Sequence, residues 1–181
     1  MNRVAARRHP NYRFFIATEM KEYSMLGLRF LPIETEKVRA LQRGQPDAYG
    51  SIPEIAVSDG DGMPCRHCLA NIEAGENYLI LAHRPFPRNQ PFAETGPVFL
   101  HERECGAAKA GPGLPEILTF SPSYILRGYG ADDRIHYGSG KVVEQADIAA
   151  YAGELFANPA IAYIHVRSAT NNCYQLRIER A

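Results

Sequence analysis

The sequence predicts a single α+β domain built mostly around an antiparallel sheet. Several short segments alternate in polarity or are continuously apolar, as strands are, but few are separated by helical patterns, so the βαβ repetition of a parallel sheet is missing. The end of the chain, residues 161–179, places alternating segments on both sides of a turn-rich SATNN, which indicates a β-hairpin. We therefore expect a mostly antiparallel sheet with two main helices and a C-terminal hairpin.

The expected elements follow from local pattern. Glutamates early and arginines late in 34–43, followed by Gly44, predict a helix there. Alanines at helical spacing in 143–158, closed by Asn158-Pro159, predict the second helix. Residues 1–11 are basic and are expected to form a flexible tail before one domain spanning 12–181. Strands are expected at 12–18, 25–30, 54–57, 78–82, 97–101, 122–129 and 134–137.

Composition excludes several classes of protein. Hydrophobic residues make up 45% of the 181 positions and charged residues 22%, as in soluble globular domains. Twenty basic and twenty acidic residues cancel, so charge favours neither nucleic acid nor a membrane surface as partner. The N-terminus lacks the apolar region of a secretory signal, and four cysteines are too few for a disulfide scaffold. We expect a cytoplasmic protein, and the sequence does not define its oligomeric state.

The C-terminal hairpin carries the first candidate site. Strand alternation places Tyr163, His165 and Arg167 on one face, and Cys173 and Arg177 on the matching face of the second strand. Tyr174, by the same alternation, is expected with the apolar Leu176 and Ile178. Arginine suits bidentate capture of a carboxylate or phosphate. The expected ligand is therefore a small anion, and its ligand-binding residues would be Arg127, Arg167, Arg177 and Tyr163.

Two catalytic residues are expected beside that anion. His165 is suited to act as acid or base, and Cys173 would lie near the reactive part of the ligand. The competing interpretation is that the arginines simply form ion pairs on a solvated face of the sheet, as charged strand residues usually do. Their partners would then be Glu154, Glu179, Asp132 or Asp133.

The second candidate site begins at Cys65-x-x-Cys68. This spacing supplies half of a tetrahedral zinc site, and Cys105 and Cys173, or His101 in place of one of them, would complete it. A redox role is a second interpretation, although the βαβ setting of thioredoxin-like proteins is missing. A third is that the cysteines pack as small apolar residues.

The loop at 85–96 is expected to pack against a site. It carries three prolines and closes on Gly96, and its length is near the upper limit of ordinary loops.

Several segments, taken in order, resemble a known family. PCRHCL at 64–69, GENYLILAHRPF at 75–86, FAETGPVFLHE at 92–102, ILRGYG at 125–130 and AYIHVRSATNNCYQLRIER at 162–180 are similar to the bacterial DUF1203 family, a domain of unknown function. The resemblance covers roughly residues 25 to 180. It implies a single soluble bacterial domain and supplies no catalytic residue.

Two hypotheses about function remain open. The sequence has no G-x-S-x-G, P-loop, G-x-G-x-x-G or H-E-x-x-H motif. The commonest classes of hydrolase, kinase, dinucleotide-binding protein and metalloprotease are therefore excluded. One hypothesis is a binding or catalytic site for a small anion on the polar face of the hairpin. The other is a non-enzymatic structural or interaction domain, stabilised by zinc through its cysteines. Whether the protein is an enzyme is not decided by the sequence.

Overall fold

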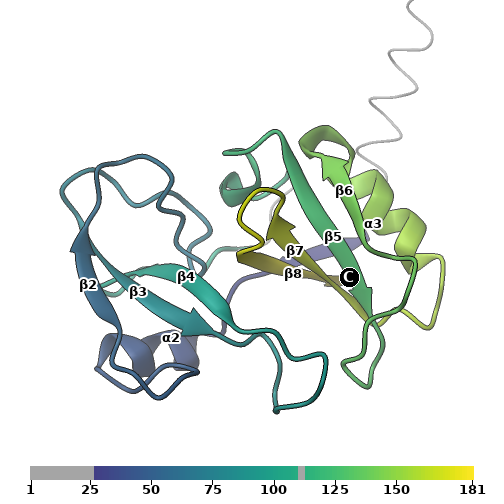
Figure 1. The fold of residues 1–181 in the computed structure, drawn as a ribbon. Helices are drawn as coiled ribbons and strands as arrows, with labels where there is room; N and C mark the ends of the chain where they lie inside the picture. Colours follow the sequence, from purple (N-terminus) through teal and green to yellow (C-terminus); the bar gives the residue numbers. More distant parts are fainter. Residues whose placement is uncertain (1–26, 110–112) are drawn as a thin grey trace, which may run out of the picture.

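The computed structural model describes residues 27–109 and 113–181. These residues form a single α+β domain with two antiparallel sheets, and the two lie side by side in Figure 1. The predicted tail at 1–11 and the predicted strand at 12–18 lie outside the described residues. Neither α-helix in the described ranges has the length and apolar character needed to cross a membrane.

The described residues form eight strands, two α-helices and two short 3₁₀ turns. The strands are β1 (Leu28–Leu31), β2 (Glu54–Val57), β3 (Asn77–His83), β4 (Gly96–His101), β5 (Ser123–Tyr129), β6 (Lys141–Glu144), β7 (Tyr163–Ser168) and β8 (Tyr174–Arg180). The α-helices are α2 (Thr35–Gln42) and α3 (Ile148–Phe156), and short 3₁₀ turns cover Glu116–Leu118 and Gln145–Asp147.

The larger sheet has the strand order β1-β8-β7-β5-β6. Helix α3 lies on its outer side, away from the smaller sheet (Figure 1). Ile148 and Ala152 of α3 pack there against Leu126, Ile164 and Leu176 of the strands, and all five are almost fully buried. This face is the main apolar core, so polar side chains of the same strands are directed to the opposite face.

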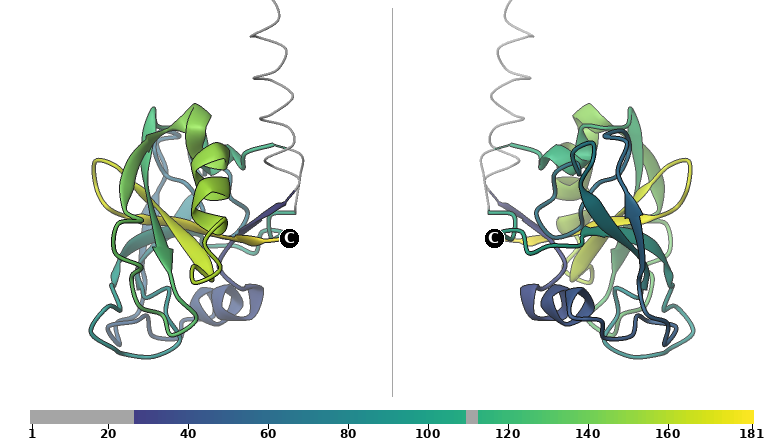
Figure 2. Two further views of the ribbon diagram at one scale, coloured as in Figure 1. Left: turned by 90° about the vertical axis from the view of Figure 1, so that its right-hand side faces the viewer. Right: turned by 90° about the vertical axis from the view of Figure 1, so that its left-hand side faces the viewer.

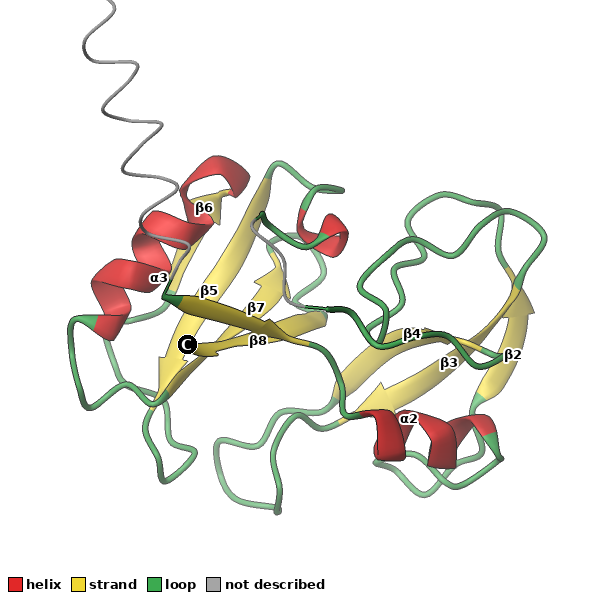
Figure 3. Ribbon diagram, turned by 180° about the vertical axis from the view of Figure 1, so that it is seen from behind, coloured by secondary structure: helices red, strands yellow, loops and turns green. Residues whose placement is uncertain are grey.

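The smaller sheet has the order β2-β3-β4 and is covered by α2, as Figure 3 shows from behind. Val38 and Leu41 supply the thin apolar stripe of α2, and both are buried against Leu79, Leu81 and Leu100 of the sheet. The stripe is narrow because the other helix positions are mostly charged or polar, so α2 covers the sheet from the surface.

The hairpin β7–β8 ties the two sheets together. Arg66, in the loop that precedes β3, donates from Nε to the backbone oxygen of Tyr174 at 2.9 Å. The Tyr174 side chain is itself part of the core of the smaller sheet. Figure 1 shows the turn of the hairpin between the two sheets, and the side views in Figure 2 show this turn on the side of the domain opposite the C-terminus.

A β-bulge reverses one predicted side-chain direction. The register of β7 and β8 shifts between Val166 and Arg167, where Val166 pairs with Leu176 but Arg167 pairs with Tyr174. One extra residue on β8, Gln175, is accommodated there. Tyr174 therefore lies on the face of His165, and its expected place beside Leu176 and Ile178 was wrong.

Two predicted boundaries also differ from the structure. The predicted helix 143–158 begins only at Ile148, because residues 141–144 form β6 against β5. The β-branched Val142 and Val143 favour a strand, and tertiary pairing with Ile125 and Tyr124 secures it. The predicted strand at 134–137 is not formed, and Ile135 makes only an isolated bridge to Tyr129.

Two neighbouring valines test the corrected boundary. Val143 is 4% exposed and Val142 is 58% exposed, as expected for consecutive residues of a strand. Val143→Ala should lower the free energy of unfolding by about 2 kcal/mol, since it removes buried methyl groups and leaves a cavity. Val142→Ala should change it by less than about 0.5 kcal/mol. Urea denaturation of the two variants measures the difference, and equal costs would contradict the strand.

Candidate functional site

Three cysteines and one histidine converge at one end of the smaller sheet. Cys65 and Cys68 belong to the loop before β3, His101 ends β4, and Cys105 follows in the next loop. One side-chain atom from each of the four lies within 4.8 Å of every other. Cys65 is fully buried, and its backbone pairs with Phe99 of β4, which brings the Cys-x-x-Cys turn to the end of that strand.

The spacing of these atoms matches a tetrahedral site. Zinc bound at about 2.3 Å to sulfur and 2.0–2.1 Å to nitrogen requires ligand–ligand separations of about 3.8 Å between sulfurs and about 3.6 Å between sulfur and nitrogen. The Cys65 and Cys105 sulfurs are 3.9 Å apart, and the Cys68 sulfur lies 3.6 Å from Nδ1 of His101. The four predicted metal ligands Cys65, Cys68, Cys105 and His101 are therefore brought close enough together to hold a metal ion, and these two separations are those that zinc requires.

Further side chains orient the four. Nε2 of His101 lies 3.3 Å from a carboxylate oxygen of Glu76, and such a contact fixes the ring so that Nδ1 faces the sulfurs. Nδ1 of His67 lies 3.2 Å from the Cys105 sulfur, and its Nε2 lies 2.9 Å from the Thr35 hydroxyl. If His67 donates from Nδ1 to the Cys105 sulfur, the Thr35 hydroxyl donates to Nε2 of His67, and the two contacts fix the ring beside Cys105.

The three sulfurs also perturb one another. Hydrogen bonds from Cys105 and Cys68 hold the pKa of the Cys65 thiol far below its usual range. The hydrogen bond with Cys65 raises the pKa of Cys105 to about 11, and the hydrogen bonds with Cys105 and Cys65 raise that of Cys68 as well. Without a metal, ionisation of Cys65 is therefore favoured, and ionisation of Cys68 or Cys105 beside it is unfavourable. A bound divalent cation would lower the pKa of all three thiols and hold them as thiolates.

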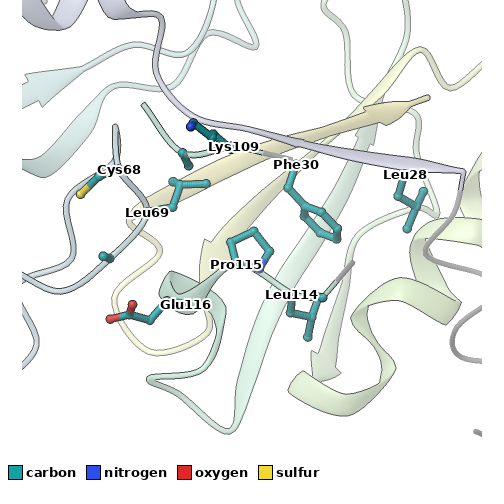
Figure 4. A pocket seen from close by; sticks show the side chains of 11 residues that line it. Leu28, Phe30, Cys68, Leu69, Lys109, Leu114, Pro115 and Glu116 are labelled. Carbon is teal, nitrogen blue, oxygen red and sulfur yellow. The ribbon is translucent and has the colours of Figure 1, made fainter. Parts of the chain in front are cut away.

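All four cysteines lie in the described residues and none forms a disulfide. Cys173 does not join the cluster, since its sulfur lies 3.6 Å from the backbone oxygen of Asn171 in the hairpin turn. Cys68 also lines a pocket of about 270 Å³, where its sulfur is directed away from the apolar Phe30 and Leu114 (Figure 4).

The polar face of the larger sheet gathers the second set of predicted residues. Arg127 of β5 is in register with His165 of β7, which is in turn in register with Arg177 of β8. Tyr163 and Arg167 flank His165 along β7, so the predicted ligand-binding residues do share one face. Arg177 stacks on the ring of Tyr163 at 3.7 Å, and its Nη2 lies 2.6 Å from Glu179.

A glutamate that the sequence did not single out holds two of these arginines. Glu94 lies in the loop 85–96, and one carboxylate oxygen is 2.7 Å from Nη1 of Arg127 while the other contacts Nη2 of Arg167. The loop does pack against the polar face, as its length and prolines predicted. The anion that Arg127 and Arg167 bind is therefore the protein's own carboxylate.

His165 is enclosed by aromatic rings. Phe86, Tyr129, Tyr163 and Tyr174 all have ring centroids between 4.7 and 5.1 Å from it. It is fully buried, and neither of its ring nitrogens has a hydrogen-bond partner among the described residues. Burial and then the charges of Arg167 and Arg177 keep its pKa well below the usual value, so the ring is neutral.

The two predicted catalytic residues are not brought together. His165 pairs with Arg177 in the sheet. Cys173 precedes β8, and its backbone oxygen accepts a hydrogen bond from the amide of Ser168 at 2.9 Å, next to the turn of the hairpin. The two side chains make no hydrogen bond in the described part of the chain. The alternation that placed them on one face took no account of the bulge between them or of the distance along the strand.

Comparison of the sequence with known protein families places the chain in one of them. Residues 62–180 match the family described as "Protein of unknown function (DUF1203)". The chain belongs to the DUF1203 family. The matched residues include all four members of the Cys/His cluster and the whole of the polar face, but β1, α2 and β2 lie before them. No curated protein and no solved structure matches the chain.

Because His83 and His165 are buried and neutral, we expect this DUF1203 domain to lose stability at acidic pH. Burial and then the positive charges of Lys37 and Arg66 lower the pKa of His83 to about 3. Between pH about 6.5 and 3 the unfolded chain therefore binds protons that the folded chain does not, and stability present above pH 6.5 is lost as the pH falls. Each such histidine contributes up to about 1.4 kcal/mol per pH unit.

Urea denaturation at pH 7 and pH 5 measures the effect. His165→Phe keeps an aromatic ring in the cage and removes one titrating group, so its unfolding free energy should fall less between the two pH values. Identical pH dependence in the variant and the wild type would show that His165 is not held neutral.

The ion pairs of Glu94 with Arg127 and Arg167, here called the Glu94 bridge, give a further prediction. Glu94→Gln leaves the 5%-exposed Arg167 side chain without its carboxylate and should lower the unfolding free energy by about 1–3 kcal/mol. Asp132→Asn is the matched control, because Asp132 and its partner Arg134 are both more than half exposed. That change should cost less than about 0.5 kcal/mol in the same denaturation measurement. Equal costs would mean that the bridge does not stabilise the face.

Proposed function

We propose that this DUF1203 domain is a zinc-stabilised binding domain whose metal is held by Cys65, Cys68, His101 and Cys105. The observation that carries the proposal is the convergence of four ligand atoms, all within 4.8 Å of one another, from three separate segments. Three thiolates and one imidazole are a common ligand set of structural zinc sites, which are closed by four protein ligands. A reducing, cytoplasmic location belongs to the same proposal, because the ligands must be free thiols.

The proposed role of the metal is to fasten the segment that follows β4 to the Cys-x-x-Cys loop. Cys105 lies beyond the last strand of the smaller sheet, whereas the loop around Cys65 is already held by backbone hydrogen bonds, such as that from the amide of Arg66 to the oxygen of Phe99 at 3.1 Å. A bound zinc would tie both segments to the end of β4. When bound, the metal supplies a closed tetrahedral crosslink, while Glu76 and His67 orient its ligands.

A small anionic ligand is the second candidate function. Arg127 and Arg167 are held by Glu94, which leaves Arg177, paired with Glu179, as the predicted ligand-binding arginine outside that contact. Arg177 lines a pocket of about 610 Å³, within the range of small-molecule sites. This observation favours binding of an anion at the Arg177 end of the polar face.

Elemental analysis of untagged protein purified without added metal tests the zinc proposal. We expect about one zinc atom per chain, released by a chelator only together with a large loss of thermal stability. Cys105→Ser should reduce the bound zinc to near zero. Cys173→Ser is the matched control and should keep the full amount, because its sulfur lies outside the cluster.

Two results would contradict the proposal. Folded wild-type protein with no bound metal, which gains none on incubation with Zn²⁺, would rule out the site. Loss of zinc in Cys173→Ser but not in Cys105→Ser would show that the ligand set is wrong.

A further inference from the structure

The pocket beside Arg177 is formed by three parts of the chain that are distant in sequence. Residues 31–35 and Lys37, from the end of β1 and the start of α2, form one wall. His83 and the segment 84–87 form the second, and Tyr174, Arg177 and Glu179 of β8 form the third. Asp133 completes the lining. The pocket therefore lies where the helix of the smaller sheet meets the hairpin of the larger one.

Three residues that line this pocket carry a buried polar atom without a hydrogen-bond partner. Nε of Arg84 and Nε of Arg177 are buried and have no partner in the described ranges, and the same is true of Nδ1 of His83. His83 is only 5% exposed. Buried polar atoms are nearly always satisfied by a protein group, a water or a ligand. Two of the three atoms are guanidinium nitrogens, which can only donate, so the residues of the lining carry donors that no acceptor in the described ranges satisfies.

The charged residues of the lining differ in whether they are already paired. Lys37, Arg84 and Arg177 face Glu34, Asp133 and Glu179, so the formal charges cancel. Two of the acids are already engaged, since Glu179 pairs with Arg177 and Asp133 accepts the Tyr163 hydroxyl at 2.9 Å. Lys37 and Arg84 form no ion pair among the residues that the structure describes. Lys37 makes only a 3.5 Å contact, with the Arg84 backbone oxygen.

The remaining walls are apolar. Ile33, Phe86 and Tyr174 are buried side chains that line the pocket, and Pro32, Pro85 and Pro87 add rigid apolar surface. Rings and prolines of this kind bury the body of a small molecule, while a few polar groups fix its orientation. A fully hydrated inorganic ion would leave this apolar surface uncovered.

We infer that this pocket binds a small organic anion, with a carboxylate or phosphate held by Arg84 and Lys37 and an apolar body packed against Phe86 and Tyr174. This inference rests on the second candidate function and assigns the groups that hold the anion, Lys37 and Arg84, to segments outside the C-terminal hairpin. His83, neutral at physiological pH because burial and nearby positive charges lower its pKa to about 3, adds an uncharged hydrogen-bonding group to the lining.

An NMR titration of the zinc-supplemented, ¹⁵N-labelled protein tests the inference with three probes of one shape. Benzoate and phenyl phosphate carry the two candidate anionic groups, and benzamide is the uncharged counterpart of benzoate. We expect at least one anion to bind saturably, with benzamide about tenfold weaker or more, as the loss of a charge-assisted hydrogen bond predicts. The stronger of the two anions identifies the group that the pocket prefers.

Three variants locate the bound anion. Lys37→Gln and Arg84→Gln should each weaken binding by about tenfold. Arg88→Gln, an exposed residue of the same loop outside the pocket, should leave binding unchanged. The wild-type shift map gives a measurement that does not depend on any variant folding, and its largest changes should fall in residues 82–87 and 174–179.

The outcomes separate the inference from the functions proposed above. Saturable anion binding with the largest shifts elsewhere, or with no effect of Arg84→Gln, would overturn this pocket and leave anion binding intact. No saturable binding of either anion below about 10 mM would overturn both. Equal binding of benzamide would overturn recognition of charge. The zinc proposal is tested separately by metal content.

Discussion

The contact between Glu94 and two arginines is the one on which the polar face of the larger sheet depends. Arg127 and Arg167 project from neighbouring strands into a space closed by the loop 85–96, and Arg167 is almost fully buried. Two guanidinium groups so close together, one of them buried, would destabilise the fold unless a carboxylate neutralised them. Glu94 does so, and the same loop brings Phe86 against His165. The loop is therefore part of the interior of the domain.

The Cys/His cluster and the pocket share one chain of contacts. His67 lies between the Cys105 sulfur and the Thr35 hydroxyl, and Thr35 also lines the pocket at the start of α2. The backbone amide of Ile33, in the same wall, donates to the oxygen of Arg66 at 2.9 Å. Whatever fixes the Cys-x-x-Cys loop therefore also positions one wall of the pocket. The two proposed activities of the domain are thus structurally connected, although different experiments test them.

Much of the fold and one of the two candidate sites followed from sequence. The alternation in the hairpin, the charge gradient of α2 and the apolar runs of β3 and β4 are local signals, and the structure has these elements within a few residues of their predicted bounds. The ligand set of Cys65, Cys68, Cys105 and His101 was also among the predicted combinations, because few residues of suitable chemistry exist. The start of α3 was missed because pairing of β6 with β5 outweighs the helical spacing of the alanines.

The sequence by itself determined which residue types could form a site and on which strands they lie, since strand alternation and metal-ligand chemistry are local properties. Only the tertiary structure decided which of them meet. The bulge after Val166 turned Tyr174 toward His165, and the pairing of β7 with β8 kept Cys173 away from it. Glu94 and Arg84 had no local signal, because their roles come from a loop folding back onto the sheet. Such long-range contacts depend on how the two sheets pack, and a single strand or helix carries no record of that packing.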